Sequence, residues 1–278
     1  MALRWPDGFI CPACGGGKGW PTARGTICCA ACNRQTSLTA GTILHNTRVP
    51  LRSWFMAMWL VCTQKRGVSA ADLQRELGLG SYRTGWLMLQ KLRQAMVRAE
   101  RDQLSGAVEV DETYLGGKEE EVRGRQLLGK KLVVIAVELE GRRVARIRLR
   151  HIPDASADSL VGFVTDCVEK EAVVHADGWQ GYAGLAQAGY KHQVTAIRDD
   201  KGLGVEAFPH VHLVASLLKR WLGATHQGKV GLKHLQGYLD EFSFRFNCRR
   251  SRYISKIFHR LAEQLCLRNA KTYREFIR

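Results

Sequence analysis

Two Cys-x-x-Cys pairs near the N-terminus constrain the fold of this chain more than any other feature. The pairs are Cys11/Cys14 and Cys29/Cys32, and fourteen residues separate them. Two such pairs close together suit the tetrahedral coordination of a structural zinc ion. The stretch between them is rich in glycine and basic residues, so it cannot bury a core of its own and needs a metal to hold it. We therefore expect residues 1–48 to form a zinc ribbon with these four cysteines as Zn²⁺ ligands.

A redox dithiol and unpaired reduced cysteines are the alternatives for these four residues. A redox Cys-x-x-Cys normally begins a helix within a βαβ unit, and the sequence before Cys11 predicts no such unit. Cys28 could compete as a ligand, but only Cys29 has the two-residue gap to Cys32. The other cysteines are scattered, and we expect them to be reduced, as in a cytoplasmic protein. They are Cys62, Cys167, Cys248 and Cys266.

The chain is strongly basic, with a formal net charge of +16. This surplus favours a polyanionic partner, most simply DNA or RNA, although a basic surface without a specific role is the alternative. The charge is concentrated toward the C-terminus, at Arg245, Arg249, Arg250, Arg252, Lys256, Arg260, Arg268, Lys271, Arg274 and Arg278. No apolar run approaches the ~18 residues of a membrane span, so we expect no membrane association.

Residues 49–104 are predicted to form a helical region. Helices are expected over residues 51–64, 70–77 and 82–100, with Ser69 and Ser81 as N-caps of the second and third. A glycine-containing turn joins the second and third helices, which makes them a helix-turn-helix candidate; a plain helical spacer is the alternative. Arg83, Lys91 and Arg93 are expected on the polar side of the third helix.

Residues 105–278 change in character and predict a mixed α/β domain. Strands are expected over residues 107–111, 131–138, 143–149, 172–176 and 193–197, and helices near 156–168, 179–186 and from 208 onward. The order βββαβαβα matches a ribonuclease-H-like layout, in which a mixed sheet carries helices on both faces. The basic helical C-terminal end is expected to belong to this domain.

Two aspartates are expected to meet at one edge of this sheet. Asp111 ends the first predicted strand and Asp177 follows the fourth, and the two strands are expected to be neighbours at the sheet centre. Converging carboxylates suit Mg²⁺, which takes oxygen ligands and phosphate oxygens. Each aspartate alone could equally be a turn or cap residue. Glu112 directly follows Asp111 and should point to the opposite face of the strand.

Four segments resemble bacterial insertion-sequence transposases of the ISXO-like type. The segments are VEVDETYLGGK (108–118), HADGWQGY (175–182), HLVASLLKRW (212–221) and YLDEFSFRFN (238–247). These transposases carry a zinc ribbon ahead of a DDE-type ribonuclease-H-like domain, and the resemblance covers nearly the whole chain. It implies a DNA transposase that nicks at terminal inverted repeats and joins the freed 3′-hydroxyl to target DNA.

The resemblance also implies a third metal ligand on a helix, with a lysine seven residues later. The matching positions here are His212 and Lys219, so a histidine stands where an acid is usual. Two helical turns separate them, which places both side chains on one face. Imidazole is a softer, uncharged ligand that favours Mn²⁺ over Mg²⁺. Glu241 is the competing third ligand, and an ordinary surface histidine is the alternative for His212.

The expected activity is therefore divalent-metal-dependent strand cleavage and strand transfer, with Asp111, Asp177, His212 and Lys219 as catalytic residues. Double-stranded DNA is the expected partner, as element ends and as target. Pairing of two ends implies a homodimer or larger assembly, located in the bacterial cytoplasm with the nucleoid. The alternatives are a non-catalytic zinc-ribbon and helix-turn-helix regulator derived from a transposase, and a ribonuclease-H-like nuclease that hydrolyses without joining.

Overall fold

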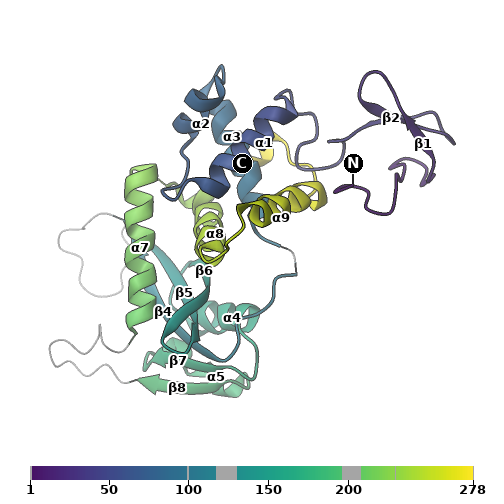
Figure 1. Cartoon of the computed structure of the whole chain (residues 1–278). Helices are drawn as coiled ribbons and strands as arrows, with labels where there is room; N and C mark the ends of the chain where they lie inside the picture. Colours follow the sequence, from purple (N-terminus) through teal and green to yellow (C-terminus); the bar gives the residue numbers. More distant parts are fainter. Residues whose placement is uncertain (1, 99, 117–129, 196–207, 229, 278) are drawn as a thin grey trace. The chain divides into compact units, whose positions relative to one another are not determined.

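The computed structural model describes residues 2–98, 100–116, 130–195, 208–228 and 230–277 (Figure 1). Contacts divide the chain into two compact units. The first unit comprises Met1–Arg98 together with Ser251–Arg278, and the second comprises Ala99–Arg250. The sequence places residues 251–278 with the α/β domain, whereas they cluster with the N-terminal residues. The reason is the amphipathic helix that begins at Ile254, whose apolar side packs on helices near the N-terminus.

The first unit begins with a small antiparallel sheet in the order β1-β2-β3. Its strands are β1 (Gly19–Pro21), β2 (Thr26–Cys29) and β3 (Gln35–Ser37). The sheet buries only a small apolar cluster around Phe9 and Ile27, against which Trp5 packs. Gly19 is required in β1, because a Cβ there would lie 2.7 Å from the carbonyl oxygen of Cys28.

Helices complete the first unit. They are α1 (Leu51–Thr63), α2 (Ala70–Leu77), α3 (Tyr82–Met96), α9 (Ile254–Leu267) and α10 (Tyr273–Ile277). Ser69 caps α2 in a reciprocal capping box with Asp72, and Ser81 caps α3, both as predicted. Gly78 ends α2 in the left-handed conformation with φ 60°. A Cβ at Gly85 would lie 2.7 Å from the carbonyl oxygen of Ala70, so α2 and α3 pack in close contact.

The predicted polar side of α3 is wrong for two of its three basic residues. Lys91 and Arg93 are buried, and the Lys91 ammonium donates to the carbonyl oxygen of Ile43 at 2.6 Å. Burial lowers the pKa of Lys91. The second half of α3 lies inside the unit, between α1, α2 and α9, and the helix ends at Met96 rather than at residue 100. Its exposed part is the first turn, with Tyr82 and Arg83.

The second unit holds a five-stranded mixed sheet in the order β6-β5-β4-β7-β8. Its strands are β4 (Ala107–Leu115), β5 (Lys131–Glu140), β6 (Arg143–Ile152), β7 (Val173–Asp177) and β8 (Lys191–Thr195). The first three pair antiparallel, while β7 and β8 add in parallel next to β4. This topology fits the predicted ribonuclease-H-like layout. The expected positions 117–118 and 196–197 lie outside the described residues.

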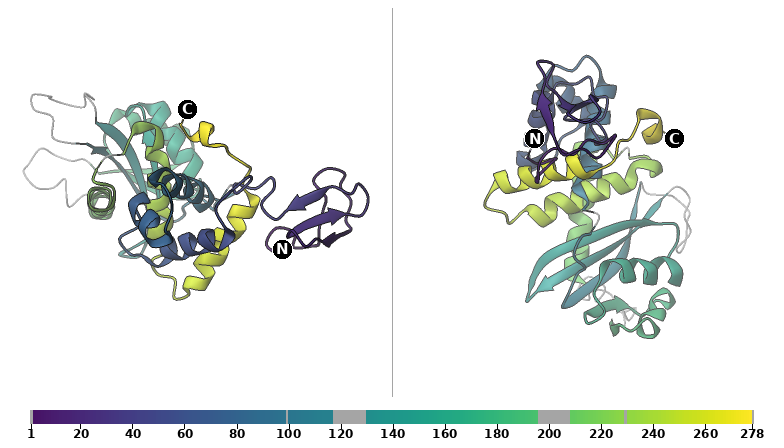
Figure 2. Two further views of the ribbon diagram at one scale, coloured as in Figure 1. Left: turned by 90° about the horizontal axis from the view of Figure 1, so that it is seen from above. Right: turned by 90° about the vertical axis from the view of Figure 1, so that its right-hand side faces the viewer.

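Helices lie on both faces of this sheet (Figure 1). They are α4 (Ala157–Cys167), the 3₁₀ helix η1 (Gln180–Tyr182), α5 (Gly184–Gln187), α7 (Pro209–His226) and α8 (Leu232–Cys248). One core lies between the sheet and α4, η1 and α5, and a second lies between the sheet and α7 and α8 (Figure 2). Successive β4 residues therefore face alternate cores, Val108 and Val110 toward α4 and Leu115 toward α7.

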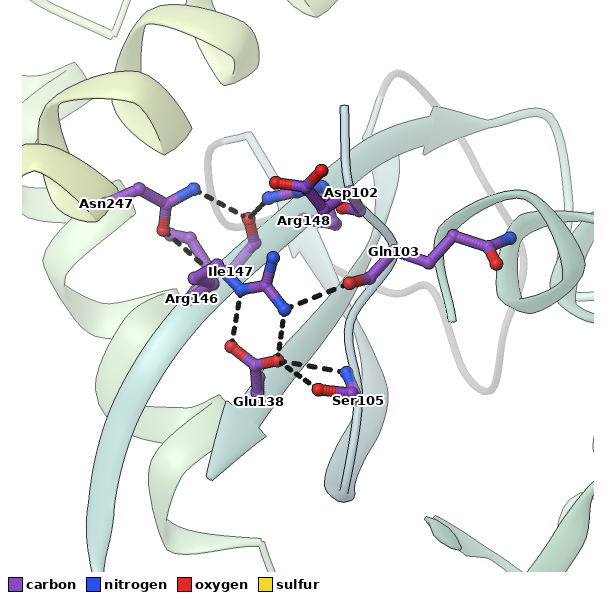
Figure 3. A network of polar contacts seen from close by, with 8 residues as sticks. All are labelled: Asp102, Gln103, Ser105, Glu138, Arg146, Ile147, Arg148 and Asn247. Atoms are coloured by element: carbon purple, nitrogen blue, oxygen red, sulfur yellow. Dashed lines mark hydrogen bonds and ion pairs between the residues drawn. The ribbon is translucent and has the colours of Figure 1, made fainter. Parts of the chain in front are cut away.

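A partly buried ion pair ties the segment before β4 to the sheet. Arg146 of β6 makes a bidentate contact with Glu138 of β5, at 2.5 and 2.6 Å (Figure 3). Glu138 also accepts from the backbone N–H of Ser105 at 2.9 Å, and Arg146 donates to the carbonyl oxygen of Gln103. Because both charges find partners, the pKa of Glu138 is lowered despite its burial.

Side chains of α8 close the outer edge of β6. Asn247 accepts from the N–H of Ile147 at 2.8 Å and donates to its carbonyl oxygen at 3.1 Å (Figure 3). Gln236 accepts from the N–H of His151 and donates to the carbonyl oxygen of Leu149. An open edge would offer these groups to another strand. Asn247 is the last residue of the segment 238–247, which resembles the transposase family. Its contacts with Ile147 show that it stabilises the edge of the sheet.

Candidate functional site

The four predicted cysteines converge in the first unit. The Sγ atoms of Cys11 and Cys32 lie 3.7 Å apart, those of Cys14 and Cys29 lie 3.6 Å apart, and all four lie within 4.8 Å of one another. Tetrahedral zinc with Zn–S bonds of about 2.3 Å needs sulfur atoms about 3.8 Å apart. The donor set therefore fits zinc. Cys28 is outside the cluster, because its Sγ contacts the carbonyl oxygen of Asn33.

Each cysteine pair forms the same kind of knuckle around its first sulfur. Backbone N–H groups of Ala13 and Cys14 lower the pKa of Cys11 to about 6. The N–H groups of Cys32 and Ala31 likewise lower the pKa of Cys29. Both cysteines thus favour the thiolate, which is the form that binds a metal.

In the second unit, Asp111 and Asp177 lie on neighbouring parallel strands. The β4–β7 pairing runs from Ala107 opposite Val173 to Glu109 opposite His175, and it ends two residues before Asp111 and Asp177. Asp177 ends β7, as predicted. Asp111 does not end its strand, because β4 continues to Leu115 in pairing with β5. Its position is instead where β4 loses its pairing with β7.

The surroundings of Asp111 disfavour the ionised form of its carboxyl group. Burial and the neighbouring Glu112 raise the pKa of the Asp111 carboxyl to about 6, and Asp177 adds to this rise. The backbone N–H of Glu112, 2.8 Å from Asp111 Oδ1, and the nearby His212 act in the opposite direction. The three predicted ligands therefore affect one another electrostatically. Among the described residues, however, only the cysteines bring three or more ligand atoms within 4.8 Å of each other.

His212 and Lys219 lie on α7, which covers the same sheet face as Asp111. His212 is half-buried in the second turn, and Lys219 is exposed two turns later. The strand residue Glu109 anchors the start of this helix: its carboxylate accepts from the backbone N–H groups of His210 and Val211, each at 3.2 Å. Glu109 is not among the site residues predicted from the sequence. The available signal was its position two residues before Asp111, which puts both on one face of β4.

Glu241 lies on α8 and is completely buried. Helix α8 packs along β6, and β5 separates β6 from β4. The charges that shift the pKa of Asp111 belong to Glu112, His212 and Asp177.

Glu112 points to the face opposite Asp111, as expected. Its Oε2 accepts a hydrogen bond from the hydroxyl of Tyr182 at 2.9 Å. Burial, followed by the charges of Glu112 and Asp111, raises the pKa of Tyr182 well above its ordinary value. The phenol therefore stays protonated and acts as the donor. The hydrogen bond between Tyr182 and Glu112 therefore lies on the sheet face opposite to Asp111.

Comparisons with known proteins give one family match and one relative in sequence. The sequence profile of the ISXO2-like transposase domain matches residues 103–247, just over half of the 278 residues. The relative is described as an uncharacterized protein in transposable element ISH50 of Halobacterium salinarum (strain ATCC 700922 / JCM 11081 / NRC-1). It is 26% identical over 263 residues, which cover 87% of each protein.

Solved structures give weaker matches. The catalytic core domain of BIV integrase is 15% identical, with a TM-score of 0.34, over 54% of this chain and 86% of that one. A simian T-cell lymphotropic virus intasome complexed with PP2A regulatory subunit B56 gamma gives 9% identity and a TM-score of 0.32, over 66% of each chain. Because both TM-scores are low, these matches do not establish the fold, and the evidence for it is the strand order of the sheet.

No helix within the described residues is long and apolar enough to cross a membrane.

Proposed function

Because the chain belongs to the ISXO2-like transposase domain family, we propose that it binds the terminal inverted repeats of an insertion sequence and catalyses metal-dependent cleavage and strand transfer. One observation carries the catalytic part of this proposal. Asp111 and Asp177 lie on adjacent parallel strands, on the sheet face covered by the helix that carries His212 and Lys219.

Asp111, Asp177 and His212 are proposed as the ligands of catalytic Mg²⁺ or Mn²⁺. Carboxylate oxygens suit either ion, and an imidazole in the set favours Mn²⁺. When bound, the ions supply an activated attacking oxygen and a stabilised leaving oxygen. Asp111 must ionise to bind, and its raised pKa makes this step pH-dependent. Lys219, exposed on the same helix, is proposed to contact a DNA phosphate near the reacting ends.

The first unit is proposed to recognise the element ends. Its zinc ribbon and the α2–α3 pair resemble DNA-binding modules, and the net charge of +16 favours salt-dependent phosphate contacts. Since Lys91 and Arg93 are buried, base contacts from α3 would come from its exposed first turn. Synapsis of two ends requires a dimer or a larger assembly, acting on DNA in the bacterial cytoplasm.

The test is a cleavage and joining assay with purified protein, a labelled terminal-repeat duplex, and Mg²⁺ or Mn²⁺. Asp177→Asn should abolish nicked and joined products while retaining DNA binding. Asp158→Asn, an exposed aspartate in the first turn of α4, is the control and should behave as wild type. Unchanged nicking by Asp177→Asn would reject the proposed site. Binding without any cleavage by the wild type would favour the non-catalytic regulator, and nicking without joining would favour a nuclease.

The third ligand is tested by comparing His212→Ala with Glu241→Gln. If His212 is the ligand, its replacement should remove most cleavage and change the ratio of activity in Mn²⁺ and Mg²⁺. Glu241→Gln should leave that ratio unchanged, even if it lowers stability through its buried position. The opposite pattern would assign the role to Glu241.

A further inference from the structure

Hydrogen bonds on the far side of the sheet connect the two aspartates through Glu112 and Tyr182. We propose that Tyr182 is a positioning residue: its hydroxyl, bonded to Glu112, fixes Asp111 relative to Asp177 and so sets the geometry of the proposed metal site. This inference rests on the proposed function of the two aspartates as metal ligands.

The connection begins at Asp111. The backbone N–H of Glu112 donates to Asp111 Oδ1 at 2.8 Å. Because side chains alternate along a strand, the Glu112 carboxylate extends to the opposite face, into the core beside α4 and η1. There it accepts from the Tyr182 hydroxyl at 2.9 Å. Movement of Tyr182 would therefore be transmitted to the Glu112 peptide, which orients the Asp111 carboxylate.

The connection ends at Asp177. The N–H of Tyr182 donates to the carbonyl oxygen of Trp179 at 2.9 Å, and the N–H of Trp179 donates to Asp177 Oδ1 at 3.1 Å. One continuous path thus runs from one carboxylate to the other. Each aspartate uses its Oδ1 in this path.

The turn that carries Tyr182 is closely packed. The Trp179 indole donates to the carbonyl oxygen of Ala155 at 2.8 Å. A Cβ at Gly181 would lie 2.6 Å from the same carbonyl oxygen, so only glycine allows this approach. Tyr182 itself is fully buried in the core beside α4. The turn can therefore act as a rigid support.

Such a support is needed because the sheet does not hold the two aspartates together. Pairing between β4 and β7 ends at Glu109 opposite His175, two residues before Asp111 and Asp177. Beyond this point β4 continues with β5, while β7 remains paired with β8. The path through Glu112, Tyr182 and Trp179 links β4 and β7 beyond the point where their backbone pairing ends.

The substitution Tyr182→Phe tests this role. It keeps the ring in the core and removes only the hydroxyl. An outer partner that orients a metal ligand typically contributes 10- to 100-fold to metal affinity, and Tyr182 is such a partner of Asp111 through Glu112. We expect Mn²⁺ binding, measured by calorimetry on the full chain without DNA, to weaken by about this factor. The Mn²⁺ midpoint of cleavage should shift equally, with the rate largely restored at saturating Mn²⁺.

Tyr190→Phe is the matched control. Tyr190 is buried in the same core, and its hydroxyl donates to the carbonyl oxygen of Val168 at 3.0 Å, away from the aspartates. Both variants should lose similar stability in EDTA, but only Tyr182→Phe should change Mn²⁺ binding.

The outcomes separate this inference from the proposed function. Wild-type Mn²⁺ affinity in Tyr182→Phe, with loss of binding in Asp177→Asn, would overturn the positioning role and leave the site intact. Equal effects of Tyr182→Phe and Tyr190→Phe would show general core damage and also overturn it. Unchanged Mn²⁺ binding in Asp177→Asn would instead refute the proposed site itself.

Discussion

Replacing Asp111 by asparagine should stabilise the metal-free protein at neutral pH. Burial and neighbouring carboxylates raise the pKa of Asp111 from 3.8 to about 6. A rise of about 2 pKa units corresponds to roughly 3 kcal/mol of unfavourable free energy for the ionised form. Asparagine has a similar shape and keeps an oxygen that can accept from the Glu112 N–H, so it removes the charge with little loss of contact.

The sign of the pH dependence follows from proton binding. Between pH 3.8 and about 6 the folded state keeps the Asp111 proton while the unfolded state has lost it. Wild-type stability from this group is therefore fully present below pH 3.8 and is lost as the pH rises through about 6. The advantage of Asp111→Asn should be near zero at about pH 4 and approach roughly 3 kcal/mol at about pH 8.

Urea unfolding in EDTA at several pH values measures this difference, with Asp158→Asn as a control that should show no such trend. Adding Mn²⁺ at about pH 8 should stabilise wild type and not Asp111→Asn, because a ligand that binds only the folded state adds to its stability. Equal stability of wild type and Asp111→Asn at about pH 8 would refute the reasoning. A variant that is less stable at every pH would also refute it, since the charge would then be favourable.

Four further substitutions have defined outcomes. Cys29→Ser should lower the bound zinc measured by elemental analysis of the purified protein, whereas Cys28→Ser should retain it, because only Cys29 lies in the four-sulfur cluster. Glu138→Gln should destabilise the protein by about 1–3 kcal/mol at pH 7 in urea titrations, since Arg146 loses its charged partner. Because the pKa of Glu138 is lowered from 4.5, this deficit should shrink as the pH falls below 4.5, and a constant deficit would contradict the ion-pair explanation. Gly85→Ala should destabilise the first unit by about 1–3 kcal/mol, seen as a lower melting temperature, because its Cβ would lie 2.7 Å from a backbone oxygen of α2.

Local features of this protein could be predicted because their signals lie within a few residues. The cysteine spacing predicts the cluster that the structure contains. Ser69 and Ser81 cap the helices that follow them, as predicted. The caps depend on contacts within one turn of chain, and the cluster depends on two Cys-x-x-Cys pairs, so the residue types and their spacing are sufficient.

Other predictions failed where burial depends on distant elements. Lys91 and Arg93 follow the polar pattern of an exposed helix face, yet the helices around α3 bury them. Residues 251–278 follow the α/β domain in sequence but pack with the first unit. Amphipathic patterns show that a face is covered without showing what covers it.

The amino-acid sequence by itself determined the spacing of the four clustered cysteines, the helix caps and the two neighbouring strands that carry Asp111 and Asp177. Only the tertiary structure decided what surrounds them. Glu109 reaches the start of α7, 101 residues away, and Glu112 meets Tyr182 across 70 residues. These contacts depend on strand register and on how each helix packs on the sheet. A shift of one residue in the register of a strand would turn each of its side chains to the opposite face of the sheet. Short-range patterns carry no information on that register, so the support behind the candidate site emerges only from the folded chain.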